Sequence, residues 1–171
     1  MEFLHIESGP EIDEIRALFL EYAQSLNFSL CFQDFDQELQ GLPGEYSLPH
    51  GRLILCRFDG KAAGCVALKR LEPQVCEMKR LYVRSEFRGH QLGRKLALHL
   101  IEEARRTGYT AMRLDTVRGT MDAAIGLYRS LGFEEIPPYY KSPVPETLFL
   151  ELDLRDAGFS PRSSNHCLVP K

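Results

Sequence analysis

Apolar residues recur at helical spacing most clearly in the segment that begins after residue 91. Apolar positions there return every three or four residues, and charged residues fall largely on the opposite side. The pattern predicts an amphipathic helix that continues to Arg106 and ends before Gly108, preceded by a strand over 75–83 and a turn over 88–94. The apolar stripe of this helix consists of Leu92, Leu96, Ala97, Leu100, Ile101 and Ala104.

Three further segments have the pattern of helices. An apolar stripe over residues 12–26 predicts a first long helix, and a short helix is expected over 34–40. A third helix is predicted over 121–131, where the hydroxyl of Thr120 has the position of an N-cap.

Short apolar or alternating runs predict the strands. Two of them flank Asp59-Gly60, which is the strongest hairpin signal in the sequence. Together with the helices, these runs predict one α/β domain with a mixed sheet and helices on both faces. Besides the strand over 75–83, we expect strands over residues 3–6, 52–58, 62–70, 111–116, 133–136 and 147–154.

The length and composition agree with a single domain. A chain of 171 residues with 44% apolar content is long enough for one ordinary core and too short for two. We find no internal repeat and no linker, so the domain is expected to cover residues 1–154. Residues 155–171 lose all periodicity and are expected to form a flexible C-terminal tail.

Charge, hydropathy and cysteine content narrow the function classes. A net charge of −3 argues against a dedicated nucleic-acid binder, and no apolar run approaches the ~20 residues that span a bilayer. The five cysteines have no spacing typical of metal ligands and are odd in number. They indicate reduced thiols in a cytoplasmic protein without a metal site, and the sequence leaves a homodimer open.

The turn over 88–94 has the composition of an anion-binding site. From Lys79 to Arg106 there are eight Lys or Arg residues against three Glu, although the whole chain is acidic. A helix that begins after a glycine-bearing turn directs free backbone N–H groups and its positive dipole end forward, where phosphate binds well. The alternative interpretation is a tight turn with a solvated basic helix face.

Four sequence segments resemble the GCN5-related N-acetyltransferase (GNAT) family. They are EMKRLYV, RSEFRGHQLGRKL, MRLDTV and AAIGLYRSLGFEEI. The family signature is Arg or Gln, two residues, Gly, one residue, then Gly or Ala; Arg88 and Gly93 match its ends, whereas Gln91 replaces its first glycine. The resemblance implies a mostly antiparallel central sheet of about seven strands and an acetyl-CoA-dependent N-acetyltransferase.

The resemblance also implies how acetyl-CoA binds. Its pyrophosphate would lie over the turn, and its pantetheine arm would follow the preceding strand through backbone hydrogen bonds. The implied cofactor-binding residues are Leu81, Tyr82, Val83, Arg88, Gly89, His90, Gln91, Leu92, Gly93 and Arg94.

Acetyl transfer to an amine requires a proton acceptor, an oxyanion donor and a proton donor for the departing thiolate. The resemblance assigns the thiolate proton to Tyr128; the alternative is a core aromatic residue. Glu77 is the candidate base, because ideal strand alternation puts it on the same face as Leu81 and Val83. A surface ion pair is the alternative for Glu77, and a water chain can replace a base. Asp115 and His90 are weaker candidates.

The amine acceptor is the least determined part of the prediction. Family resemblance points to residues 27–51 and 137–146 as walls of its site. We expect a primary amine of a small molecule, with a protein N-terminus or lysine as the rival and a non-catalytic acyl-CoA-binding module as another alternative. Aromatic side chains that can line the site are Phe28, Phe32, Phe35, Tyr46, Tyr139 and Tyr140.

Overall fold

The computed structural model describes residues 1–155, which form one seven-stranded sheet with helices on both faces. The strands lie in the order β1-β2-β3-β4-β5-β7-β6, and each pair is antiparallel except β4 with β5. The strands are β1 (Glu2–His5), β2 (Arg52–Phe58), β3 (Lys61–Glu72), β4 (Val75–Val83), β5 (Ala111–Val117), β6 (Glu134–Ile136) and β7 (Thr147–Asp153). The predicted mixed sheet is confirmed.

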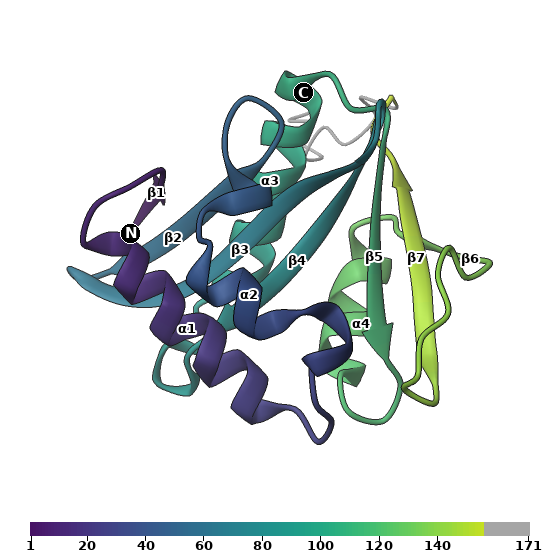
Figure 1. Ribbon diagram of the computed structural model, residues 1–171, viewed down its shortest axis with the longest axis horizontal. Helices are drawn as coiled ribbons and strands as arrows, with labels where there is room; N and C mark the ends of the chain where they lie inside the picture. The colour runs from purple at the N-terminus through teal and green to yellow at the C-terminus, as the bar shows by residue number, and fades with distance from the viewer. Residues whose placement is uncertain (156–171) are drawn as a thin grey trace, which may run out of the picture.

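The helices divide between the two faces of the sheet, as Figure 1 shows. Buried residues of α1 and α2 pack on one face, and those of α3 and α4 pack on the other, so each face has its own apolar core. The helices are α1 (Glu11–Ser25), α2 (Phe35–Gln40), α3 (Leu92–Thr107) and α4 (Asp122–Ser130), with 3-10 turns η1 (Cys31–Gln33), η2 (Gly44–Tyr46) and η3 (Ser85–Phe87). All are too short or too polar to cross a membrane, within the described residues.

Local sequence signals located most of these elements correctly. The predicted hairpin is present: Phe58 pairs with Lys61, and Asp59 and Gly60 take φ values of 50° and 76°, as a type I′ turn requires. The predicted N-cap of α4 is wrong, because the hydroxyl of Thr120 donates to Asn27 Oδ1 instead.

The predicted C-terminal tail lies outside the described residues, except for Arg155. Of the five cysteines, the four in the described part of the chain are free thiols, and three of these are buried.

The parallel strands β4 and β5 separate along their length. They are paired only between Val75–Glu77 and Ala111–Arg113, and Figure 1 shows them diverging beyond that point. Beyond Glu77, therefore, the backbone groups of β4 that face β5 have no partner strand. This separation opens a cleft in the middle of the sheet, lined by residues of both strands and by Tyr128 of α4.

Candidate active site

A β-bulge in β4 sets the direction of the side chains at the cleft. Cys65 of β3 pairs with Tyr82, and Ala67 pairs with Lys79, so a single residue of β3 opposes two residues of β4. Arg80, one of those two, has a φ of 59°. As a result, Lys79 and Arg80 both face α1 and α2, although they are consecutive.

This bulge corrects the predicted surroundings of Glu77. Glu77 and Lys79 face the side of α2, whereas Leu81 and Val83 pack against the core under α3. The four side chains therefore do not share one face, because the extra residue shifts the alternation after Lys79. Ideal alternation was the wrong assumption for this strand.

Glu77 is a buried carboxylate, with 4% of the residue exposed, rather than a surface ion pair. Its Oε1 accepts the hydroxyl hydrogen of Tyr139 at 3.0 Å. Lys79 Nζ lies 3.9 Å from the same oxygen, and Lys69 Nζ lies 3.8 Å from Oε2. Burial, followed by the charge of Glu77, raises the pKa of Tyr139, so its hydroxyl keeps the hydrogen that it donates.

A second carboxylate lies across Lys79 from the first. Asp115 on β5 lies 3.6 Å from Lys79 Nζ and accepts the hydroxyl hydrogen of Tyr140 at 3.1 Å. Burial, and then the charge of Asp115, raises the pKa of Tyr140. Lys79 thus contacts acidic groups from both separated strands, and the adjacent tyrosines of the β6–β7 loop hold one carboxylate each.

Arg80 joins the bulge to α2. Its guanidinium donates two hydrogen bonds to Glu38, at 3.0 and 2.6 Å, and one to Gln33 at 3.0 Å. Burial raises the pKa of a carboxyl group, but hydrogen bonds from Arg80 and Tyr46 outweigh this effect and hold the pKa of Glu38 below its ordinary value. A buried ion pair with these additional bonds fixes the position of α2 against β4.

The turn before α3 presents unpaired amides. The first intrahelical bond runs from Lys95 N to Gln91 O at 3.0 Å, so the amides of residues 92–94 have no acceptor inside the helix. Gly89 has a φ of 87°, and Gln91 at the usual glycine position has a φ of 58°. Gln91 therefore adopts the left-handed conformation that the family's glycine adopts freely.

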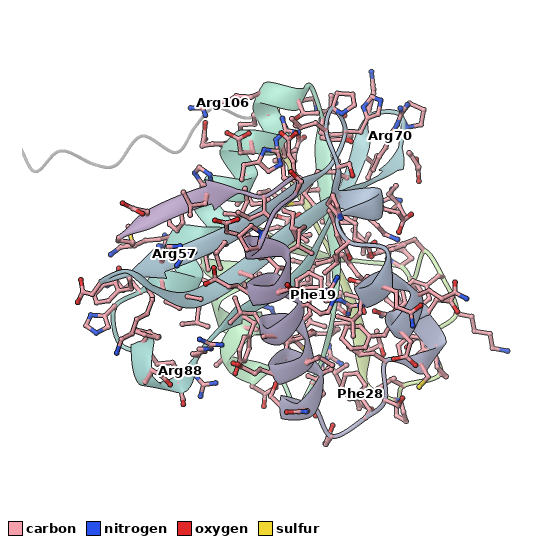
Figure 2. The ribbon with its side chains drawn as sticks, turned by 60° about the vertical axis from the view of Figure 1, so that its left-hand side comes forward. Phe19, Phe28, Arg57, Arg70, Arg88 and Arg106 are labelled. Atoms are coloured by element: carbon pink, nitrogen blue, oxygen red, sulfur yellow. The ribbon has the colours of Figure 1, made fainter. Side chains whose placement is uncertain are left out.

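The turn also has cationic side chains. Arg88 is exposed, and Figure 2 shows it and Arg106 at opposite ends of the molecule, as the two ends of α3 require. Arg94 donates to Ser130 of α4 at 2.8 Å. His90 is exposed and its ring packs on Phe58, with 4.7 Å between centroids, so it is not part of the carboxylate cluster.

Tyr128 of α4 lies at the cleft between β4 and β5. The cleft is also lined by Leu81 and Asp115, whereas Tyr82 turns to the opposite face and packs edge-on against Tyr22. Burial raises the pKa of Tyr128, so its phenol is protonated at neutral pH. The ring packs against Phe133, which shows that the proposed donor is a core residue as well.

A larger cavity of about 890 Å³ opens on the side of α2. Both segments predicted as walls line it, the first with Phe32 and Tyr46 and the second with Tyr139 and Tyr140. Two of the predicted aromatics lie elsewhere: Phe28 lines the cleft, and Phe35 packs in the core, 5.1 Å from the guanidinium of Arg80.

The cavity and the cleft share three residues, Gln33, Lys79 and Arg80, so they meet at the bulge. Sequence reasoning found Glu77, Asp115 and Tyr128 near this junction, and Lys79 beside Glu77, but it did not find Lys69. The cross-strand pairing of Lys69 with Glu77 depends on the β3–β4 register, for which the sequence carries no local signal.

The separated parallel strands, the amide-bearing turn and the adjoining cavity define an acyltransferase fold. The sequence matches the model of the Acetyltransferase (GNAT) family over residues 12–133, and the chain belongs to that family. The protein is therefore an N-acetyltransferase by family, as the resemblance implied.

Individual proteins resemble the chain in sequence or in fold. The chain is 40% identical to an uncharacterised N-acetyltransferase of Schizosaccharomyces pombe, over 84% of this chain and 89% of the relative. A putative acyl-CoA N-acyltransferase of Klebsiella pneumoniae has a TM-score of 0.67 and 28% identity, and the match covers 90% of this chain and 97% of that one. A Bacillus subtilis acetyltransferase solved in complex with CoA has a TM-score of 0.65 at 20% identity, over 89% of this chain and 97% of that one.

Proposed function

We propose that the protein transfers the acetyl group of acetyl-CoA to a primary amine of a small molecule, by direct attack in a ternary complex. The observation that carries this proposal is the meeting of the cleft and the cavity at Lys79, beside the buried carboxylate of Glu77. One opening suits the acyl donor and the other suits the acceptor, so both substrates reach the same junction.

The turn and the cleft have the groups that acetyl-CoA requires. The free amides of residues 92–94, with the exposed Arg88 in the same turn, suit a diphosphate, because several donors converge there without a metal. Over Leu81–Val83, the backbone groups of β4 that face away from β3 suit the amides of the pantetheine arm. The GNAT family uses acetyl-CoA, and the CoA complex of the Bacillus subtilis relative has the same fold.

The chemistry follows from the protonation states of the side chains. The amine of the acceptor, with a pKa near ~10, loses a proton to Glu77, directly or through water, and attacks the thioester carbonyl carbon. A β4 backbone N–H near Leu81 or Tyr82 stabilises the oxyanion. The carbon–sulfur bond then breaks, and Tyr128, whose pKa is raised by burial, protonates the CoA thiolate. The attacking nitrogen loses its second proton as the amide forms, and this proton restores the phenol of Tyr128.

The shape of the cavity favours a small acceptor over a protein N-terminus or lysine. Its volume of about 890 Å³ is within the range of small-molecule sites. The β6–β7 loop is tied to Glu77 and Asp115 by two tyrosine hydroxyls, so this wall is held close to the carboxylates. A peptide substrate needs an open groove at the same place.

Thiol release from acetyl-CoA with a panel of amines tests this function. We expect release that depends on the amine, and a fall of about 10²–10⁴-fold in kcat for Tyr128→Phe with little change in acetyl-CoA affinity. Tyr109→Phe, which alters a buried tyrosine outside the cleft and the cavity, is the matched control and retains the rate. Amine-independent release, or a Tyr128→Phe rate equal to that of the parent, contradicts the assignment.

A further inference from the structure

We propose that the acceptor is a small amine that also carries a carboxylate, such as a free amino acid, and that Lys69 recognises the carboxylate. This inference rests on the proposed acetyltransferase function and identifies its substrate class. The observation behind it is the distribution of used and unused hydrogen-bond donors around the cavity of about 890 Å³.

The acidic groups at the junction are already occupied by donors. Glu77 accepts a hydrogen bond from Tyr139 and has two lysine ammonium groups within 4 Å. Asp115 accepts one from Tyr140 and has Lys79 at 3.6 Å. These carboxylates can accept the proton of one amine. A diamine would need a further buried acid for its second amine, and among the described residues the cavity has none without a cationic partner.

The basic groups, by contrast, have donors to spare. Lys79 Nζ makes one hydrogen bond, to Gln33 at 3.2 Å, and Lys69 Nζ makes one, to Glu45 at 3.3 Å, although each ammonium has three N–H groups. Lys141 also lines the cavity, and within the described residues its ammonium is in no ion pair.

Lys69 is the cation best placed for a substrate carboxylate. It pairs directly with Glu77 across β3 and β4, so a positive and a negative side chain lie next to each other. An amino acid has the complementary arrangement of a carboxylate next to an amine. The present partner of Lys69 is Glu45, which has 73% of its side chain exposed. An incoming carboxylate therefore displaces Glu45 into water with little loss of free energy.

The same geometry disfavours an amino acid whose carboxylate is blocked. A primary amide or a peptide bond has no negative charge for Lys69, and it leaves a half-buried ammonium facing a neutral group. Decarboxylated amines lack the group altogether. Among an amino acid, its primary amide and its decarboxylated amine, which all have the same side chain, the free amino acid is therefore the preferred substrate.

The experiment compares amino acids with their primary amides and their decarboxylated amines, for several side chains, by thiol release from acetyl-CoA. We expect kcat/KM to be about ten- to a hundredfold higher for the free amino acid of the best set, mainly through KM. Lys69→Met retains the aliphatic stem and abolishes this ratio. Lys61→Met, at an exposed position outside the cavity, preserves it.

Each outcome has a distinct meaning. Amides or decarboxylated amines that react as well as the amino acids contradict the carboxylate proposal but leave the acetyltransferase function in place. A preference that survives Lys69→Met in a variant with unchanged Tm contradicts the role of Lys69. Thiol release with no amine of the panel contradicts the proposed function itself, and this proposal with it.

Discussion

At the scale of single residues, the proposed chemistry depends on Glu77 and Lys79. Glu77 is almost fully buried, yet it lies on a strand between two lysines and beneath a tyrosine hydroxyl. A buried carboxylate requires such partners, because an unpaired charge away from water is strongly unfavourable. Lys79 couples it to Asp115, so the ionised groups of both strands form one network at the proposed reaction centre.

Replacement of Glu77 by Gln tests the base directly. Gln keeps the shape and still accepts a hydrogen bond, but it cannot take a proton from the amine. We expect kcat to fall about 10²–10⁴-fold and the decrease in rate at acidic pH, where a carboxylate base is protonated, to disappear from the pH–rate profile. The measurement is thiol release between acidic and alkaline pH.

Glu135→Gln, at an exposed position of β6, is the control and retains the profile of the parent. If the Glu77→Gln enzyme keeps the rate of the parent and its decrease at acidic pH, Glu77 is not the base, and a water chain or Asp115 takes that role.

At the scale of elements, the sequence predicted those helices, strands and turns that are determined by a local pattern of residues. The turn over 88–94, helix α3 and the β2–β3 hairpin were located from periodicity and turn residues. The bulge at Arg80 was not, because arginine carries no preference for positive φ and the bulge results from pairing with β3. The bond from Tyr139 to Glu77 spans 62 positions, so only the tertiary fold brings these residues together.

The turn before α3 contains a strained position that a substitution can relieve. Gln91 has a φ of 58°, a backbone conformation that is less favourable for a residue with a Cβ than for glycine. We expect Gln91→Gly to raise the free energy of unfolding by about 1 kcal/mol and Tm by about 2–4 °C. Thermal unfolding of the intact chain measures this shift.

Gln91→Ala is the matched variant, because it retains the Cβ and so the strain, and its Tm should not rise. A glycine variant that unfolds at the same or a lower temperature than the alanine variant rejects the strain argument.

At the scale of the whole molecule, the two faces of the sheet have separate tasks in the proposed mechanism. The face of α3 and α4 has the amide-bearing turn and Tyr128, and the face of α1 and α2 has the cavity and Glu77. The gap between β4 and β5 joins the two sides. In the proposed mechanism each substrate enters from its own face, and this is the arrangement that a ternary complex requires.

The most direct test of this arrangement is calorimetric titration of the protein with acetyl-CoA, for the parent, Gly93→Ala and Gly93→Trp. A Cβ at Gly93 meets only Leu127 and Val83, at 3.8 and 3.9 Å, so alanine fits, whereas we expect the much larger indole to obstruct the start of α3. We predict saturable binding to the parent and the alanine variant, with affinity at least about tenfold weaker for tryptophan. Absence of binding to the parent, or equal affinity of all three folded proteins, contradicts binding of the diphosphate at the start of α3.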